Sequence, residues 1–406
     1  MRSTALSVSL GASLCLALAA CNFSSGNDQS GEGGAQQAGS EAASNNLADT
    51  MASTDGTSEG DSAAGMADFQ QQPTMQLQVV LDRLGFTPGV VDGEVGSSTR
   101  NALEGFQEAN GLAVSGELDT ETKQALEQWR SIPATRMVTI PADFAQGPFQ
   151  PTPESAAEQA KMDRLGYTSL DEKLAERFHT TVDTLAMLNS SARPAASASP
   201  ATAGSPTPTP SASASSSGDA GSTPRPAMFR AGQQIRVPNV GADQIAPGSV
   251  DDQQWLATLR TLGVGSQQPG AERIVVSKSA GTLKVFDKDD KLIGMYTATM
   301  GSTQDPLPLG DWKVNGVAHN PPFEFDPDLF WDVPDSEAEQ TLPPGPNGPV
   351  GVVWIDLSKE HYGIHGTPEP QTIGRAESHG CVRLTNWDAA RLAQMVSPGT
   401  KVLFES

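Results

Sequence analysis

The sequence predicts a multidomain protein whose largest folded part, residues 272–406, is mostly β with one C-terminal helix. Short β-prone runs separated by Gly- and Asp-containing turns fill this part. A 23-residue repeat with helical spacing occupies residues 73–131, which predicts a small three-helix N-terminal domain. Because the 406 residues include 40 Gly and 30 Pro, many of them in Ser/Ala-rich tracts, we expect these modules to be joined by disordered linkers.

The formal net charge of −22 argues against some classes of partner. An acidic surface repels phosphate backbones and anionic lipid. We therefore expect no nucleic-acid binding.

Residues 1–20 have the features of a secretion signal. One charge, Arg2, precedes an apolar run that is too short to span a bilayer and ends in small residues. The run closes with Leu18-Ala19-Ala20-Cys21, which resembles the lipobox of bacterial lipoproteins; ordinary cleavage without acylation is the alternative. The resemblance implies that Cys21 is lipidated. Asn22 after it favours the outer membrane, so we expect a periplasmic, lipid-anchored protein.

Residues 21–72 contain almost no large apolar side chains. They cannot bury enough surface to offset the entropy of ordering. We expect a disordered tether with a root-mean-square reach of roughly 40 Å, which suits a span from a membrane to a nearby layer.

Residues 73–131 are predicted to form three helices. Gly93-Glu94-Val95 and Gly116-Glu117-Leu118 are related by the offset of 23, and each triplet leads into a short helix, capped by Gly96 and Asp119 respectively. Apolar residues three and four apart form one buried stripe. The pattern resembles the peptidoglycan-binding domain 1 family, which implies binding of wall glycan or peptide. A helical spacer without a ligand is the alternative.

Residues 160–240 contain two segments that resemble parts of a LysM glycan-binding module. The first covers residues 166–189, and the second, a closing strand, covers residues 230–239. Residues 193–226 between them have no helical or strand periodicity, so we expect them to loop out disordered. Thr168-Ser169-Leu170-Asp171 replaces the usual Gly-Asp-Thr-Leu opening, so a structural remnant without a glycan site is the alternative.

Five β-prone runs and one helix are expected in residues 272–406. The spacing of the turn residues predicts hairpins. The runs cover residues 274–278, 282–286, 291–296, 310–314 and 350–355. The helix is expected over residues 387–396, with Thr385 or Asn386 as its N-cap.

Cys381 is expected to be the free thiol of the exported chain, because Cys15 leaves with the signal and Cys21 is blocked. A lone thiol in an oxidising compartment is either buried and inert or chemically used. A neighbouring imidazolium would lower the thiol pKa and supply the proton that a leaving amine needs. His365, at the end of an apolar strand, is the better candidate for that imidazole, whereas His379 could line the pocket or position substrate.

The residues around Cys381 suit acyl transfer. Gly380-Cys381 permits a tight turn, in which the amides of His379, Gly380 and Cys381 can converge to stabilise an oxyanion. Arg383 offers a planar cation for a substrate carboxylate, the alternative being a surface charge.

The segments Ile364-His365-Gly366-Thr367 and Ser378-His379-Gly380-Cys381-Val382-Arg383-Leu384 closely resemble the YkuD family of L,D-transpeptidases. This resemblance extends over residues 272–406 and implies that Cys381 is the nucleophile, His365 the acid/base and the Gly366 carbonyl the acceptor that orients the imidazole. It also implies a substrate-binding pocket formed by Ser378, His379, Gly380 and Arg383. Two features depart from the family: many members have Asn at the position of Arg383, and Leu307-Pro308-Leu309-Gly310 replaces the usual Thr-Pro-x-Gly.

The resemblance to the YkuD family implies a thioester mechanism. We expect Cys381 to attack the carbonyl between the third residue of a wall stem tetrapeptide and its terminal D-Ala. Transfer to the amine of another stem peptide would give a cross-link, transfer to a lysine of an envelope protein would give an attachment, and transfer to water would trim the peptide. Residues 320–349, acidic and rich in Pro and aromatic residues, are either a lid over the site or a surface insertion.

Other functions fit less of the sequence. A metal site built from His361, His365, His379 and Cys381 would rarely place Ser-His-Gly-Cys in one tight turn, so we expect no metal and no cofactor. A papain-like peptidase would place its cysteine before its histidine. An L,D-carboxypeptidase or other wall hydrolase of the same fold, or a non-enzymatic tether between membrane and wall, are the alternatives that stay open.

Overall fold

The computed structural model describes residues 72–190, 227–241, 244–330, 333, 337–378 and 380–406. The predicted signal peptide, the lipidation site Cys21, the tether up to residue 71, the insertion 193–226 and His379 lie outside these residues. No helix within the described ranges combines the length and the apolar character that crossing a membrane requires.

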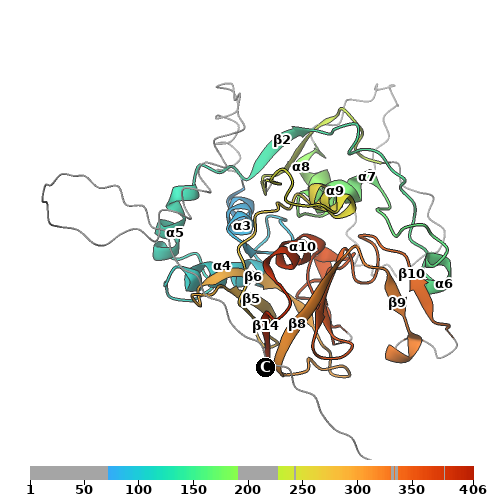
Figure 1. The fold of residues 1–406 in the computed structure, drawn as a ribbon. Helices are drawn as coiled ribbons and strands as arrows, with labels where there is room; N and C mark the ends of the chain where they lie inside the picture. Colours follow the sequence, from blue (N-terminus) through green and yellow to red (C-terminus); the bar gives the residue numbers. More distant parts are fainter. Residues whose placement is uncertain (1–71, 191–226, 242–243, 331–332, 334–336, 379) are drawn as a thin grey trace, which may run out of the picture. The chain divides into compact units, whose positions relative to one another are not determined.

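Three helices form in residues 73–131, as predicted (Figure 1). They are α3 (Pro73–Arg83), α4 (Ser97–Ala109) and α5 (Thr120–Leu126), followed by the 3-10 helix η1 (Glu127–Trp129). Both predicted N-caps are confirmed. Gly96 precedes α4, and the carboxylate of Asp119 accepts the backbone N–H of Thr122 at 2.8 Å.

Buried glutamines fix the two repeated turns of this helical unit. The side-chain oxygen of Gln78 accepts the N–H of Gly93 at 2.7 Å, and that of Gln107 accepts the N–H of Gly116 at 2.9 Å. Both glutamine side chains are buried, so these hydrogen bonds are shielded from water. Each turn is thereby held against the helix that precedes it.

The two LysM-like segments come together in one βααβ unit. The strands β2 (Thr135–Thr139) and β3 (Gln234–Pro238) pair antiparallel and carry the helices α7 (Leu170–Arg177) and α8 (Val182–Leu188) between them. A short helix, α6 (Ala156–Gln159), lies in the connection from β2 to α7. The first strand precedes residue 160, so the predicted start of this unit was too late. The strand β2 was not recognised in the sequence because about thirty residues separate it from α7.

The β-rich part is built on a ten-stranded sheet with the order β1-β6-β5-β4-β14-β8-β11-β12-β13-β7. Its strands are β1 (Phe86–Thr87), β4 (Arg273–Ser277), β5 (Thr282–Phe286), β6 (Leu292–Thr297), β7 (Thr299–Met300), β8 (Gly310–His319), β11 (Val353–Leu357), β12 (Gly363–His365), β13 (Val382–Arg383) and β14 (Lys401–Glu405). The five predicted runs correspond to β4, β5, β6, β8 and β11. The strand β1 belongs to the helical unit and pairs in parallel with β6, so the sheet extends beyond the predicted domain.

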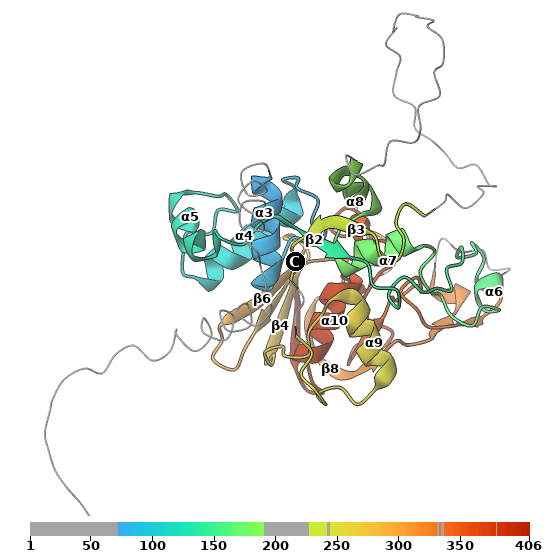
Figure 2. The ribbon, with the colours of Figure 1, turned by 90° about the horizontal axis from the view of Figure 1, so that it is seen from above.

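Two helices cover the core of this sheet, and only one of them was predicted. The helix α10 (Asn386–Met395) is capped by Thr385, whose hydroxyl accepts the N–H of Asp388 at 3.1 Å. The helix α9 (Gln253–Leu262) lies beside α10 (Figure 2) and buries Trp255 in the same apolar core. The folded core therefore begins about twenty residues before the predicted boundary at 272.

Residues 320–349 contain a hairpin. The strands β9 (Phe323–Phe325) and β10 (Gln340–Leu342) pair antiparallel, and a 3-10 turn, η3 (Pro327–Leu329), follows β9. Phe330 stacks on Phe325 with ring centroids 5.7 Å apart. The base of the hairpin is joined to the βααβ unit, since the N–H of Leu165 donates to the carbonyl of Pro344 at 3.1 Å.

A buried charge cluster joins the helical unit, the βααβ unit and the β-rich part. Asp82 of α3 contacts His179, with Nδ1–Oδ1 at 3.2 Å, and Arg391 of α10, with Nη1–Oδ1 at 3.1 Å. The ring of His179 stacks on Trp387 with centroids 4.9 Å apart. All four side chains are nearly inaccessible to solvent. Ion pairs in such surroundings tie their elements together, because a single buried charge left behind is costly.

Candidate active site

Adjacent strands bring His365 beside the segment that begins with Cys381. The strands β12 and β13 are parallel, with Ile364 opposite Val382 and His365 opposite Arg383. Side chains alternate between the two faces of a strand. Cys381 directly precedes Val382 and lies outside β13; if this alternation continued through it, its side chain would turn to the face of His365.

The imidazole of His365 is held in a fixed orientation. Its Nδ1 lies 2.7 Å from the carbonyl oxygen of Gly366, which assigns the ring proton to Nδ1 and leaves Nε2 as the basic nitrogen. The ring of Trp354, opposite His365 on β11, stacks on the imidazole at a centroid distance of 5.6 Å. Burial, followed by the charge of Arg383, lowers the pKa of His365 to about 4. The imidazole is therefore neutral at pH 7.

The thiol of Cys381 is also neutral at rest. Burial raises its pKa, although the backbone N–H of Gly363 and the charge of Arg383 act in the opposite direction. In the described residues the thiol donates to the carbonyl of His361, with Sγ–O at 3.8 Å, and not to His365. The expectation that an imidazolium ionises the sulfur therefore stays a prediction. Burial disfavours both charged forms, and the sequence does not reveal its extent.

The turn before Cys381 is fixed by side chains on both sides. The hydroxyl of Ser378 donates to the carbonyl of Cys381 at 2.7 Å and accepts the N–H of Gly301 at 2.7 Å. Gly380 has φ +99°, and a Cβ there would lie 2.7 Å from the ring of Tyr362. Glycine is required at this position for both reasons.

The positive charge of Arg383 acts on both Cys381 and His365. It lies between Thr299 of β7 and His365 of β12, and its guanidinium favours the thiolate of Cys381 and the neutral form of His365. A fixed cation of this kind lowers the free energy of any negative charge that forms beside it.

Comparison with known proteins identifies two parts of the chain. Residues 271–403 match the "L,D-transpeptidase catalytic domain" model, named YkuD, and residues 70–126 match a "Putative peptidoglycan binding domain". "Putative L,D-transpeptidase YqjB" of Bacillus subtilis is 30% identical over 141 residues, which are 33% of this chain and 72% of that protein. The chain belongs to the YkuD family of L,D-transpeptidases.

Two further relatives of this YkuD chain are informative about coverage. "Putative L,D-transpeptidase YkuD" of Bacillus subtilis is 54% identical over 129 residues, which are 32% of this chain and 63% of that protein. The chain thus spans less than two thirds of that relative. A solved L,D-transpeptidase from Mycobacterium smegmatis is 25% identical, with a TM-score of 0.28, over 34% of this chain and 60% of its own.

Three residues of the YkuD site were missed in the sequence. Tyr362 packs against Gly380, Trp354 stacks on His365, and Asn386 lies against Gly366. Tyr362 is near enough to Cys381 for a thiolate there to raise its pKa, after the larger effect of burial. Only Tyr362 could have been proposed from the sequence, because it lies three residues before His365. The other two contacts depend on strand and helix packing.

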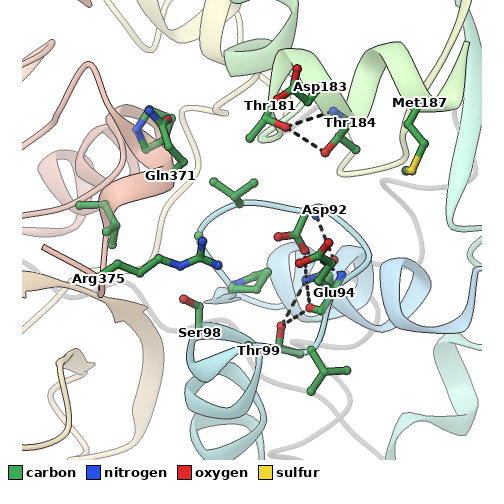
Figure 3. A pocket seen from close by; sticks show the side chains of 18 residues that line it. Asp92, Glu94, Ser98, Thr99, Thr181, Asp183, Thr184, Met187, Gln371 and Arg375 are labelled. Atoms are coloured by element: carbon green, nitrogen blue, oxygen red, sulfur yellow. Dashed lines mark hydrogen bonds between the residues drawn. The ribbon is translucent and has the colours of Figure 1, made fainter. Parts of the chain in front are cut away.

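A polar cavity of about 430 Å³ lies where the helical unit, α8 and residues 370–375 of the YkuD domain meet (Figure 3). Asp92, Glu94 and Asp183 are among its lining residues, and Arg375 points toward Asp92 and Glu94 from the opposite side. The lining residues 370–375 belong to the segment that connects His365 to Cys381. Amines and carboxylates of one ligand could both find partners in this cavity.

Proposed function

We propose that the chain is an L,D-transpeptidase that acts on peptidoglycan stem peptides, with Cys381 as nucleophile and His365 as general base and acid. Two observations support the proposal: β12, which carries His365, pairs with β13, which begins directly after Cys381, and Nδ1 of His365 is engaged by Gly366. A neutral imidazole with a free Nε2 is the form that can accept a proton.

The reaction then begins from a neutral pair. The thiol leaves the carbonyl of His361 by rotation about its Cα–Cβ bond, and its proton passes to Nε2 of His365 as Sγ attacks the substrate carbonyl. The Sγ–C bond forms, the C–N bond to the terminal D-Ala breaks, and the proton on His365 goes to the leaving amine. The acceptor amine then attacks the thioester, gives its proton to His365, and releases Cys381, which takes the proton back.

Positive charge and backbone amides stabilise the oxyanion formed in each step. We propose that backbone N–H groups of the turn at Gly380, which has a positive φ, face the oxyanion, and that Arg383 adds positive charge. We propose that Ser378 holds this turn in place. Substrate binding by Ser378, His379 and Gly380 is a prediction from the resemblance to the YkuD family. His365 stays in one tautomer throughout, because its Nδ1 proton remains with Gly366.

The acceptor decides the outcome. Transfer to a second stem peptide produces a cross-link, transfer to a lysine of an envelope protein produces an attachment, and transfer to water is an L,D-carboxypeptidase reaction. The aromatic hairpin β9–β10 is the candidate lid that would exclude water and favour an amine. Wall binding by the helical unit, and lipid anchoring at Cys21 in the periplasmic face of the outer membrane, would hold the domain at its substrate.

We place wall binding at the polar cavity. Stem peptides carry amines and carboxylates, which complement Asp183 and Arg375 respectively. Binding of the protein to insoluble peptidoglycan should weaken several-fold in the double variant Asp183→Asn with Arg375→Gln and be unchanged in Glu127→Gln, an exposed carboxylate outside the cavity. Equal binding by all three proteins would remove the cavity from the proposal.

The deciding experiment is mass spectrometry of purified wall tetrapeptides incubated with the protein or with Cys381→Ala. Cross-linked dimers that have lost one D-Ala, formed by the unaltered protein and absent with Cys381→Ala, would support transfer. Trimmed monomers alone would point to a hydrolase. Unchanged tetrapeptides with both proteins would favour the non-enzymatic tether.

A further inference from the structure

The amide of Asn386 lies against the backbone that orients His365. Asn386 is fully buried at the start of α10. Its Oδ1 accepts the N–H of Val352 at 3.3 Å and sits so near Gly366 that a Cβ there would lie 2.2 Å from it. The carbonyl of Gly366 is the partner of the His365 Nδ1. The position of this amide therefore limits where the His365 ring can go.

The orientation of the Asn386 amide is set partly from outside the YkuD domain. Its Nδ2 donates to Oε1 of Glu176 at 2.8 Å and to the carbonyl of Pro346 at 3.1 Å. Both partners are acceptors, so the nitrogen must face them and the oxygen must face Gly366. Glu176 belongs to α7 of the βααβ unit, which lies next to α10 (Figure 2).

Glu176 is itself held by one more side chain. The hydroxyl of Tyr167 lies 2.8 Å from Oε2 of Glu176. Glu176 is only 5% exposed and forms no ion pair with any described residue. An acid buried without a counter-charge is costly to stability unless its hydrogen bonds are well made. Here those bonds lead from Tyr167 through Glu176 to Asn386.

We propose that Glu176 and Tyr167 are positioning residues for His365, acting through Asn386 and the backbone of Gly366. The βααβ unit is then a structural part of the catalytic site in addition to any role in glycan binding. The inference rests on the proposed function only for its kinetic readout, since the orientation of the imidazole can be followed without a substrate.

Substitutions at Glu176 separate positioning from folding. Glu176→Gln keeps an oxygen for Asn386 and offers an amide to Tyr167, so it is the conservative variant that should retain the network. Glu176→Ala removes both contacts, and Tyr167→Phe removes only the hydroxyl. Glu158→Ala is the control, because Glu158 lies on α6 of the same unit, is exposed and pairs with Lys161 instead of with Tyr167, Glu176 or Asn386.

The experiment uses the full chain and three measurements. Steady-state kinetics are measured on a wall tetrapeptide, and the rate of Cys381 alkylation by iodoacetamide is measured as a function of pH. ¹⁵N NMR reports the tautomers of the histidines. For Glu176→Ala we expect kcat to fall on the order of 10- to 100-fold, with KM changed less than about 3-fold, because small displacements of a catalytic group carry losses of this size. The Nδ1–H signal of His365 should broaden or move. Tyr167→Phe should show a smaller loss of the same kind, and Glu176→Gln and Glu158→Ala should stay close to the unaltered protein.

Two results would overturn the inference. One is a folded Glu176→Ala protein with unaltered kcat, alkylation profile and His365 signal. The other is a Glu176→Gln protein as impaired as Glu176→Ala, since the shape of the network would then not matter. Should Glu176→Ala fail to fold, Tyr167→Phe and Glu176→Gln decide by the same criteria. If the unaltered protein does not process the peptide, the proposed function fails, while the NMR and alkylation readouts still test the positioning.

Discussion

Arg391 of α10 and Asp82 of α3 form a buried, two-pronged ion pair, with Nη1–Oδ1 at 3.1 Å and Nη2–Oδ2 at 3.2 Å. The pair joins the YkuD domain to the helical unit, and His179 of the βααβ unit adds a third contact to the same carboxylate. Two parallel hydrogen bonds between a guanidinium and a carboxylate are among the stronger polar contacts in proteins. The helical unit and the βααβ unit are therefore both part of the structural support of the YkuD domain.

Removing the carboxylate at Asp82 should destabilise the whole described unit. Asp82→Ala removes the nearer of the two carboxylates beside the buried Arg391, and losses of about 3–5 kcal/mol are typical when one partner of a buried ion pair is removed. Urea unfolding followed by tryptophan fluorescence measures the effect. Glu127→Ala, which breaks the exposed pair with Arg130, should change the free energy of unfolding by less than about 1 kcal/mol. Equal effects of the two substitutions would contradict the structural role of the buried pair.

Glu176 should make the protein less stable as the pH rises. Burial raises its pKa from 4.5 to about 8, with the hydrogen bonds from Asn386 and Tyr167 opposing the shift. A folded-state pKa above the unfolded one contributes stability that is complete below about pH 4.5 and is lost as the pH rises toward 8. As the pH rises through this window, the melting temperature of Glu176→Gln should increase relative to that of the unaltered protein. A constant difference between them from pH 4.5 to 8.5 would speak against the raised pKa.

Gly380 should tolerate no side chain. Gly380→Ala places a Cβ against Tyr362 in a backbone conformation that L-residues rarely adopt, so the turn carrying Cys381 must shift. We expect at least a 100-fold loss of kcat with little change in melting temperature. Gly316→Ala, on β8 with open space around its Cα, is the control and should retain full activity. A fully active Gly380→Ala enzyme would show that the turn is not needed in this form.

Arg383 should set the ionisation of both reacting groups. In Arg383→Met the pKa of Cys381 should rise further and the pKa of His365 should rise from about 4, because the same positive charge lowers both. The alkylation rate of Cys381 should then increase at higher pH than in the unaltered protein, and NMR should follow His365. Unmoved titrations would mean that Arg383 has no electrostatic role at rest.

Much of the catalytic site could be predicted because its signals are local in sequence. His365 and Cys381 are sixteen residues apart, and the segments around both are distinctive enough to indicate adjacent strands and a tight turn. The helix α10 and its cap Thr385 followed from the same kind of short-range pattern. The features that could be predicted are therefore those whose residues all lie within one short segment of the sequence.

Other features depend on contacts between distant segments. Asn386 and Glu176 are 210 positions apart, and the burial that keeps Cys381 and His365 neutral arises only when the strands pack. The helix α9 had clear end signals in Asp252 and Gly263, yet it preceded the predicted domain and was not recognised as part of its core. The strand β2 was missed because a long insertion separates it from α7.

The most direct test of the central claim is intact-protein mass spectrometry after brief exposure to a wall tetrapeptide. We expect an acyl adduct on Cys381, equal in mass to the peptide without its terminal D-Ala, that is absent in Cys381→Ala and forms far more slowly in His365→Gln. Processing of the tetrapeptide by Cys381→Ala, or an adduct that forms at the full rate without His365, would contradict the account.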